Sequence, residues 1–366
     1  MAIARKIRRF SIGFVSLFLL YVAVILIHGS LTNYSPPPVL PLSPHGDVMA
    51  PNLPVDSSFR IISWNIGYAG LGAEATFFYS GGGFFTSGGR MVHPTQALNQ
   101  QFTSGILDLL SREEADFYLL QEVDRESSRS YFTNQHELIE KRLAGTVNTF
   151  AVNYDVKRVP APILQPWSAY GKTLSGLSTF SRHHLANAER ISLPGRSAWP
   201  THLFQLDRCV AVHDIPLENG KKLILVNVHN AAFDKTGAIR AMQMKFLKEL
   251  LQKEYEAGHY VIAGGDWNQS PPFFDNQRLN DGRRPNFRSP NMPPELFPDT
   301  WQWIYDPTQA TVRDNSQVYN EQDNYVRLID YFLISPNVQA LKVRCIDQQF
   351  RFSDHQPVSL EFRLQP

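Results

Sequence analysis

The chain has 366 residues, of which 43% are hydrophobic and 19% charged, and its formal net charge is +1. This composition is typical of a globular protein and excludes a disordered or fibrous chain. The near-neutral balance argues against a protein that grips long stretches of nucleic acid, although it leaves room for a local basic groove. Cys209 and Cys345 form no CxxC pair, so they indicate two buried thiols, with a disulfide as the alternative.

The N-terminus indicates a membrane anchor. Basic residues in 1–9 precede an uncharged apolar stretch, Phe10 to Ile27. A helix of this length spans roughly 27 Å, close to a hydrocarbon core of about 30 Å, whereas the apolar regions of signal peptides hold about 7–15 residues. We therefore expect a basic cytoplasmic tip at 1–9, an uncleaved transmembrane signal-anchor at 10–28 and an extracytoplasmic remainder. Secretion after signal cleavage is the alternative.

Residues 29–58 are rich in proline, which breaks helices and favours extended polyproline geometry. They are expected to form a semi-rigid spacer. No second linker or internal repeat follows, so residues 59–366 are expected to form a single folded domain.

Short apolar runs that end in polar residues predict buried strands in this domain. They are Arg60–Ile66, Ala115–Asp124, Lys221–Asn230, His259–Asn268 and Arg327–Ser335. A further strand, Arg208–Ile215, is joined to Lys221–Val228 by Glu218-Asn219-Gly220, a typical hairpin turn.

Helices are predicted between these strands from apolar residues at helical spacing. The first is Thr95–Ser111, with Leu98, Phe102, Ile106 and Leu109 toward the core. The second runs from about Thr236 to Ala257, with Ile239, Met242, Phe246 and Leu250 toward the core. The mixture predicts a layered α/β sandwich of packed sheets with helices outside.

A glycine-rich stretch, Gly67 to Gly89, is interleaved with aromatic residues. No GKS or GKT follows, which excludes a P-loop. It is either a flexible surface loop or an aromatic lid over a site.

Polar residues at the predicted strand ends form one candidate site: Asn65, Glu122, His229, Asp266, Asn268, Asp330, Asp354 and His355. Carboxylates that converge without Lys or Arg would repel one another, and a hard cation such as Mg²⁺ resolves this. Histidines transfer protons near neutral pH, and Asp330 can hold one ring in its tautomer. The adjacent His183-His184 pair is interpreted as structural, because neighbouring strand residues point opposite ways.

The sequence lacks the motifs of two common classes of hydrolase. There is no G-x-S-x-G elbow of a serine hydrolase and no HExxH signature of a zinc hydrolase.

The motifs, in chain order, are SWNIG at 63–67, LLQEVD at 119–124, GLSTFSR at 176–182, VNVHN at 226–230, GGDWNQSP at 264–271, LIDYFLIS at 328–335 and SDHQPV at 353–358. This ordered set resembles the endonuclease/exonuclease/phosphatase superfamily, which includes pancreatic-type deoxyribonucleases, bacterial sphingomyelinases and inositol-polyphosphate phosphatases. The resemblance covers residue 59 to the end. It implies a four-layered α/β sandwich of two packed mixed β-sheets flanked by helices, here preceded by one transmembrane helix.

The resemblance also implies roles for the site residues. Glu122 would be the principal Mg²⁺ ligand, with Asn65 beside it and Asp354 completing the metal side; Mn²⁺ is the alternative ion. Asp266 would orient or activate the attacking water, and Asn268 would hold the phosphate. His355, paired with Asp330, would bind or protonate the scissile phosphate, with His229 as the second histidine. The implied reaction is in-line attack of water on phosphorus, assisted by one or two metal ions.

The sequence departs from the family pattern at Asn230-Ala231-Ala232 and at Leu177, so contacts to the substrate are expected to differ. Tyr170, Lys172 and Asn153 are weak candidates for such contacts, and each could equally serve packing or the surface. The sequence also resembles a bacterial branch with RSYF-like and DRC-like stretches, here Arg129–Phe132 and Asp207–Cys209. That branch supplies no substrate.

The function expected from these observations is hydrolysis of a phosphodiester, such as a lipid head group. An extracytoplasmic nuclease, helped by the basic run Arg278–Arg288, and a phosphomonoesterase are alternatives, and a non-catalytic binding module is a remote one. The expected partners are the phosphate-ester substrate and the membrane, with nucleic acid not favoured and no protein partner inferred. The sequence gives neither the substrate nor the oligomeric state.

Overall fold

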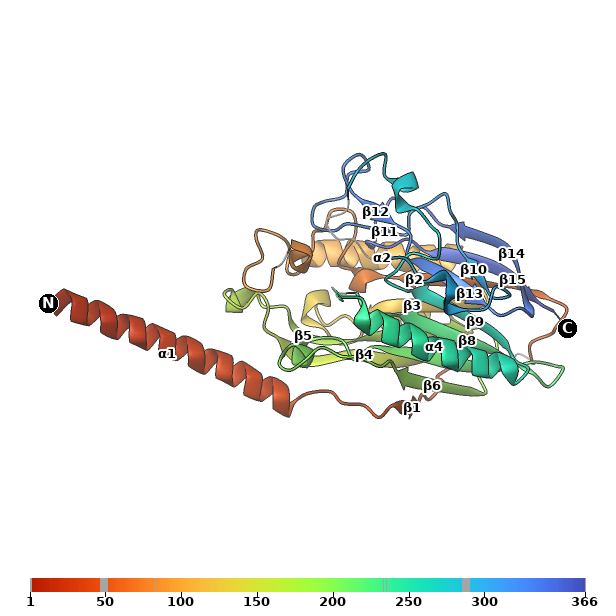
Figure 1. Cartoon of the computed structure of the whole chain (residues 1–366), viewed down its shortest axis with the longest axis horizontal. Helices are drawn as coiled ribbons and strands as arrows, with labels where there is room; N and C mark the ends of the chain where they lie inside the picture. Colours follow the sequence, from red (N-terminus) through yellow and green to blue (C-terminus); the bar gives the residue numbers. More distant parts are fainter. Residues whose placement is uncertain are drawn as a thin grey trace.

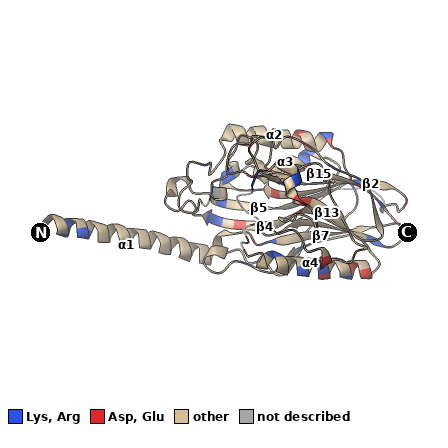
Figure 2. Cartoon of the chain, turned by 45° about the horizontal axis from the view of Figure 1, so that its top comes forward, with Lys and Arg blue, Asp and Glu red and all other residues tan. Residues whose placement is uncertain are grey.

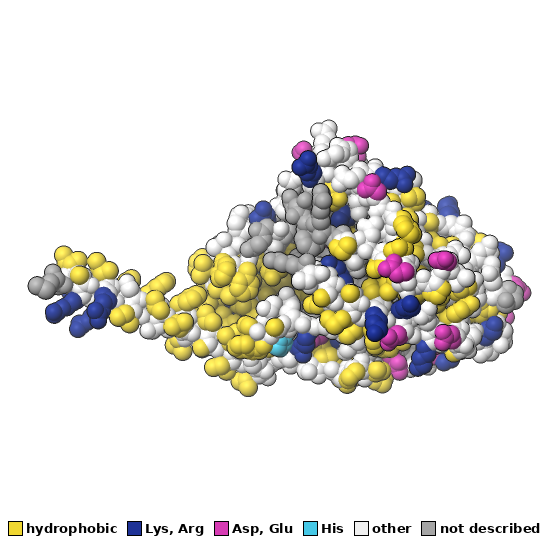
Figure 3. All heavy atoms as spheres, in the orientation of Figure 1, with side chains coloured by type: hydrophobic (Ala, Val, Ile, Leu, Met, Phe, Trp, Pro, Cys, Tyr) yellow, Lys and Arg dark blue, Asp and Glu magenta, His cyan; other side chains and the backbone are white. Residues whose placement is uncertain are grey.

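A computed structural model describes residues 2–46, 52–81, 83–232, 234, 236–284 and 290–365. One long helix, α1 (Ala2–Leu31), leads away from a layered domain (Figure 1). Within the described residues, α1 is the one helix long and apolar enough to cross a membrane. Its Lys and Arg residues lie near its N-terminal end (Figure 2), and the rest of its surface is largely hydrophobic (Figure 3). The helix exceeds the expected 10–28 because the basic tip is helical too.

The domain contains two large sheets. The first holds seven strands in the order β1 (Val39–Pro41), β6 (Asn187–Ser192), β7 (Cys209–Pro216), β8 (Lys222–His229), β9 (Tyr260–Asp266), β13 (Asp330–Ile334) and β10 (Gln302–Ile304). The second holds six in the order β14 (Val338–Cys345), β15 (Val358–Leu364), β2 (Ser58–Asn65), β3 (Phe117–Asp124), β5 (Gly171–Ser181) and β4 (Val147–Val159). The short strands β11 (Val312–Arg313) and β12 (Val326–Arg327) pair separately.

Both sheets are mixed, as expected. Strands β2 and β3 run parallel in one sheet, and β8 and β9 run parallel in the other, whereas the neighbouring pairs are antiparallel. The predicted strands all form, and β7 and β8 form the predicted hairpin. Because β2, β3, β8 and β9 all end in polar residues, the register of these pairs sets the position of the candidate site.

The sheets pack face to face over an apolar core, and helices cover their outer faces. Side chains alternate along each strand, so Ile61 points into the core between the sheets while its neighbour Ile62 packs under the helices. Helices α2 (Gln96–Arg112) and α3 (Gln135–Arg142) cover the six-stranded sheet, and α4 (Ala238–Glu256) covers the seven-stranded one. The result is the expected four-layered α/β sandwich (Figure 1).

The predicted core face of α4 is confirmed only in part: Phe246 and Leu250 pack against the core, but other positions differ. Met242, expected inside, is 46% exposed, whereas Arg240 and Gln243 are buried beside Met244, Leu247 and Leu251. The polar pair is buried because it serves the loop after β8: the Gln243 side chain accepts a hydrogen bond from the Ala231 N–H at 2.9 Å, and Arg240 donates to the Asp234 carbonyl at 2.8 Å. The buried face of α4 therefore includes two polar side chains and is not made of its apolar residues alone. In α2, Phe102, Ile106 and Leu109 are buried as expected.

The proline-rich segment is not a free spacer. Its strand β1 pairs with β6, its His45 exchanges backbone hydrogen bonds with Asn148, and its Leu53 is fully buried between the sheets. Residues 47–51 lie outside the described part of the chain. The departure has a physical reason: the segment contains apolar residues between its prolines, and burying them against the domain is favourable.

The two thiols are buried and free, so no disulfide joins them. Cys209 opens β7 in the seven-stranded sheet, and Cys345 ends β14 in the other.

Candidate active site

The polar ends of the central strands of the two sheets meet at one point. The Asn65 amide nitrogen, at the end of β2, donates to Glu122 Oε1 at 3.2 Å and to Asp266 Oδ2 at 3.1 Å. Asp266 lies beside His229 in the parallel β8–β9 pair and opposite Asp330 in the antiparallel β9–β13 pair. Side chains far apart in the sequence are therefore brought into one cluster by the strand register.

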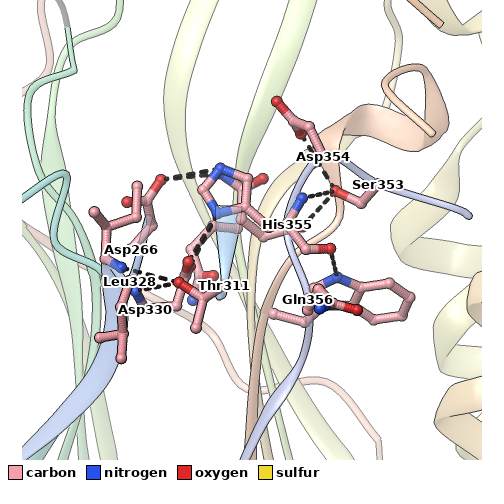
Figure 4. A network of polar contacts seen from close by, with 12 residues as sticks. Asp266, Thr311, Leu328, Asp330, Ser353, Asp354, His355 and Gln356 are labelled. Atoms are coloured by element: carbon pink, nitrogen blue, oxygen red, sulfur yellow. Dashed lines mark hydrogen bonds and ion pairs between the residues drawn. The ribbon is translucent and has the colours of Figure 1, made fainter. Parts of the chain in front are cut away.

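His355 lies between two carboxylates (Figure 4). Its Nδ1 is 2.9 and 3.1 Å from the two oxygens of Asp330, and its Nε2 is 3.8 Å from Asp266 Oδ2. Burial lowers the pKa of His355, but Asp330 and then Asp266 outweigh burial and raise it to about 10. The ring is therefore an imidazolium at neutral pH, able to bind a phosphate oxygen or to donate a proton to it.

His229 is in the opposite state. Its Nε2 is 3.5 Å from Asp266 Oδ2 and 3.7 Å from Glu122 Oε1, and its buried Nδ1 has no partner among the described residues. Burial, followed by the charges of Arg208 and His355, holds its pKa well below the usual range. The site thus places a neutral and a charged imidazole beside the same carboxylate.

Glu122 lies at a bulge of β3, with φ +53° and a side chain that is partly exposed. The Gly67 N–H donates to Asn65 Oδ1 at 3.0 Å, and a Cβ at Gly67 would lie 3.0 Å from Asp354 Oδ1. Burial raises the pKa of Asp354, and the Glu122 charge raises it further. These carboxylate and amide oxygens form the donor set that a hard divalent cation prefers.

A second acidic cluster, Asp266, Asp330 and His355, also has ligand atoms within 4.8 Å of one another. In this cluster His355 Nδ1 is bonded to Asp330 Oδ2 at 2.9 Å, so a cation bound between these two groups would have to replace that hydrogen bond. Among the described residues, the Glu122 carboxylate itself forms no hydrogen bond to a histidine, and His229 Nε2 lies 3.7 Å from it.

Asn268 follows β9 with φ +55°. Its backbone N–H donates to Asp266 Oδ1 at 2.9 Å, and its side chain donates to the Asn230 carbonyl at 2.9 Å. Asn230 is one of the residues at which the sequence departs from the family pattern, and its carbonyl here orients Asn268.

The weaker substrate candidates have other neighbours. Tyr170 is buried and accepts a hydrogen bond from Arg129 at 2.6 Å, and Lys172 forms an ion pair with Glu126 at 2.5 Å. Asn153 is buried on β4, and neither polar atom of its side chain has a partner among the described residues. None of the three contacts the cluster around Asp266 directly through a hydrogen bond between described residues.

Arg208 was missed as a site residue by the sequence reasoning, which expected no cation among the carboxylates. One of its guanidinium nitrogens, Nη1, is buried with no partner among the described residues. Burial lowers the pKa of Arg208, while the nearby Glu122 and Asp266 oppose that change. The available signal was the Asp207–Cys209 stretch, where an arginine directly precedes the buried strand β7.

The Arg129–Phe132 stretch also acquires a structural role. Arg129 forms a buried bidentate ion pair with Asp124 at 2.8 and 3.0 Å, and its guanidinium lies 3.7 Å from the centre of the Tyr68 ring. Tyr68 belongs to the turn that follows Asn65. The pair therefore fixes the wall of the site next to the proposed metal side.

The glycine-rich stretch is partly packed and partly exposed. Phe78 packs against Tyr170 with ring centres 5.6 Å apart, and Arg313 donates hydrogen bonds to the carbonyls of Leu71, Gly72 and Ala75. Among its later residues, Phe84 and Phe85 are exposed, and Gly82 lies outside the described residues. The segment is thus packed at its start and exposes aromatic side chains near its tip.

His183 is structural, as expected. Its Nε2 is 3.1 Å from Asp116, and its ring packs against Phe59 and Phe117.

Solved structures share this fold at low identity. An endonuclease/exonuclease/phosphatase from Beutenbergia cavernae DSM 12333 has a TM-score of 0.54 and 16% identity over 84% of this chain and 72% of its own. One from Bacteroides vulgatus has a TM-score of 0.53 and 13% identity over 84% and 100%. ANGEL2, a 2′,3′-cyclic phosphatase, has a TM-score of 0.55 and 13% identity over 89% and 99%. At these identities the likeness establishes the fold. No curated protein matches the chain significantly.

A comparison with models of protein families identifies the family. The model of the Endonuclease/Exonuclease/phosphatase family matches residues 62–355, a span that includes every residue of the cluster described above. The chain therefore belongs to the endonuclease/exonuclease/phosphatase family.

Proposed function

We propose that the chain is a Mg²⁺-dependent phosphodiesterase, anchored in a membrane by α1, that hydrolyses the head group of a lipid or a similar diester. The observation that supports this most is the shared cluster around Asp266, in which Asn65 links it to Glu122 and His355 links it to Asp330. Membership of a family of phosphoesterases and nucleases supports the reaction class.

The residues divide the chemistry among them. Asp266 is buried, and burial raises its pKa, so it is suited to accept a proton from an attacking water. Asn268, held by the Asn230 carbonyl, would hold a phosphate oxygen. The imidazolium of His355 would stabilise charge on the phosphate or protonate it. His229, kept neutral, would accept a hydrogen bond or relay a proton.

A divalent ion would be held by the carboxylates of Glu122 and Asp354, which offer oxygen ligands of the kind that Mg²⁺ or Mn²⁺ binds. Asn65 would lie beside it, with its amide nitrogen bonded to Glu122 and its oxygen accepting from Gly67. When bound, the ion would supply positive charge that offsets the charge of the phosphoryl oxygens. The unpartnered nitrogen of Arg208 adds a protein cation on the same side, suited to a non-bridging phosphate oxygen.

The long apolar helix supports a membrane location. With basic residues at its start, the orientation that the positive-inside rule favours places the N-terminus in the cytoplasm and the catalytic domain outside it. An enzyme held at a bilayer meets lipid phosphodiesters at high local concentration, which favours a lipid substrate.

An extracytoplasmic nuclease is the alternative. Its predicted basic run, Arg278–Arg288, lies partly outside the described residues, since 285–289 are not described. Of the described part, Arg283 donates to the backbone carbonyls of Leu279 and Asn280 in its own loop and of Glu321 in another segment. A phosphomonoesterase remains a further alternative, and the non-catalytic reading is disfavoured because all eight site residues are present.

The test is hydrolysis by the full chain purified in detergent. The panel holds phospholipid in mixed micelles, plasmid DNA, a generic phosphodiester and a phosphomonoester, each with and without Mg²⁺. We expect Mg²⁺-dependent release from the lipid that is lost in Asp266→Ala and His355→Ala but kept in His183→Ala, a histidine at the opposite end of the strands. Cleavage of DNA alone, weakening steeply as salt rises, would favour the nuclease. Hydrolysis that survives both site substitutions would contradict the proposed site.

A further inference from the structure

An exposed apolar patch lies beside the point where α1 leaves the domain. Its members come from three separate segments and range in exposure from 41% for Phe84 to 81% for Trp167. They are Phe84, Phe85, Leu164, Trp167 and Trp199. We call these five residues the aromatic patch. Exposing this many large apolar side chains to water on one end of a domain is unfavourable unless another apolar surface covers them.

The first two segments run side by side. The Ile163 N–H donates to the Phe84 carbonyl and the Leu164 N–H to the Phe85 carbonyl, each at 3.0 Å. Trp167 follows within the short turn Pro166–Ser168, and the rings of Phe84 and Phe85 pack edge to face at 5.2 Å. The backbone hydrogen bonds therefore hold these side chains together at the tip of the domain.

The third segment joins the patch to α1. Trp199 directly precedes the turn Thr201–Phe204, and the Phe204 ring packs so closely on α1 that a Cβ at Gly29 would lie 3.1 Å from it. Phe204 also packs on the cluster of Phe78, Tyr154 and Tyr170 that underlies the other two segments. Hydrophobic surface accordingly continues from α1 onto the adjacent end of the domain (Figure 3).

We propose that the aromatic patch is a second membrane contact, inserted into the interface of the same bilayer that α1 enters. This inference rests on the proposed function in that it takes α1 as a membrane anchor. We infer a bilayer as the surface that covers the patch because the patch is continuous with α1. A surface beside the point where a membrane helix leaves the bilayer faces the lipid head groups. Tryptophan is the residue that favours this depth.

Charge at the edge of the patch agrees with this assignment. The exposed Arg158 donates to the Pro166 carbonyl at 3.2 Å, so it lies beside the turn that bears Trp167, and it forms no ion pair with a described residue. An arginine next to interfacial tryptophans is placed to meet lipid phosphates.

Docking would also bring the catalytic cluster to the membrane. Tyr170, beneath the patch, packs against Tyr68 with ring centres 6.4 Å apart, and Tyr68 belongs to the turn that follows Asn65. Tyr170 and Tyr68 thus connect the region beneath the patch to the site, so a docked domain would work on molecules at the bilayer surface.

The experiment uses the full chain in nanodiscs made of equal parts phosphatidylcholine and phosphatidylglycerol. Cys209 and Cys345 are buried, so a new surface cysteine can be labelled selectively with an environment-sensitive fluorophore. The test position is Trp167→Cys. The matched control is Leu341→Cys, a 43% exposed apolar residue of β14, which lies at the edge of the six-stranded sheet opposite to β4. A nitroxide on the lipid chain then serves as the quencher.

We expect quenching at position 167 to be several-fold greater than at position 341, and to fall toward the control when Phe84→Ser and Phe85→Ser are added. Equal quenching at both positions, or a chain that does not stay with the nanodisc, would overturn the proposal. Hydrolysis of a water-soluble diester is measured on the same samples. Docking without hydrolysis would leave this inference standing and refute the proposed function, whereas hydrolysis without docking would do the reverse.

Discussion

At the scale of single residues, the site is defined by how two histidines of the same type acquire opposite charge states. His355 has Asp330 against one ring nitrogen and Asp266 near the other, which favours the imidazolium. His229 is equally buried, but Arg208 and His355 oppose its protonation. Environment, and not residue type, therefore assigns the charged and the neutral role.

Arg208 gives the first prediction. Substituting Arg208→Ala removes a cation that has a buried, unpartnered nitrogen, so binding of the reacting phosphate should weaken. A charged hydrogen bond contributes about 1.5–3 kcal/mol, so kcat/KM should fall roughly 10- to 100-fold. Steady-state kinetics of the Mg²⁺-dependent reaction measures this. Arg196→Ala is the control, because Arg196 is half-exposed and its ion pair with Asp207 is long, at 3.7 Å. Equal losses in both variants would refute a specific role.

His213 gives a prediction for stability against pH. It is fully buried, with Nε2 2.8 Å from Thr149 Oγ1, and burial lowers its pKa from 6.5 to about 4. Between pH 6.5 and about pH 4, the His213 ring is protonated in the unfolded chain but stays neutral in the folded chain. Stability should therefore be full above about 6.5 and fall as pH drops toward about 4, by about 3 kcal/mol from this group.

Urea unfolding of the full chain at several pH values between these limits measures the effect. His213→Gln should show a shallower loss over that window, while His184→Gln, at an exposed position, should follow the parent chain. An unchanged slope in His213→Gln would show that other groups dominate the acid sensitivity.

At the scale of elements, the sequence predicted β2, β3, β7, β8, β9 and β13 but not β4, β5, β6, β10, β14 or β15, and it predicted the buried face of α4 only in part. A buried strand such as Tyr260–Asp266 is read directly from an apolar run that ends in polar residues. The face of α4 depends on Arg240 and Gln243, whose burial is decided by backbone groups of another segment. The short strand β1 was missed for a similar reason, since three residues become a strand only when β6 is beside them.

The candidate site was also predicted only in part from the sequence. Asn65, Glu122, His229 and Asp266 were found because each lies at or near the end of an apolar strand. Asp330 opens β13, and Asp354 and His355 precede β15, so these three were identified through the ordered motifs of the family resemblance. Arg208 precedes its strand, and its proximity to Glu122 and Asp266 arises only when the two sheets pack. Local pattern therefore identifies residues at strand ends, but not those supplied by packing.

Gly265 gives the prediction for the central strand β9. Its φ is +148°, and a Cβ there would lie 2.0 Å from the Val228 carbonyl oxygen of the neighbouring strand. Gly265→Ala should lower the free energy of unfolding by about 3 kcal/mol or more, because both overpacking and backbone strain oppose it. Gly145→Ala, also at positive φ but with open space around it, should cost only about 1 kcal/mol. Urea denaturation compares the two, and equal costs would contradict the packing argument.

At the scale of the whole molecule, the chain combines a family domain with a helix suited to a membrane. The segment between them is fixed to the domain by β1 and by the buried Leu53, so the end of α1 is placed against the turn Thr201–Phe204. The domain is therefore not suspended on a free tether. Its orientation to a bilayer is restricted, which is the physical basis for expecting a substrate at the membrane surface.

The central claim is that Glu122 organises a divalent ion for phosphodiester hydrolysis. The most direct measurement is the rate of hydrolysis of a generic phosphodiester by the full chain as Mg²⁺ is titrated, for the parent, Glu122→Gln and Glu126→Gln. Glu126 is the control, a more exposed glutamate just beyond the same strand that pairs with Lys172. We predict no hydrolysis without metal. We also predict that Glu122→Gln, but not Glu126→Gln, lowers the apparent metal affinity or the activity by about 10- to 100-fold. Metal-independent hydrolysis, or equal behaviour of the two variants, would contradict the claim.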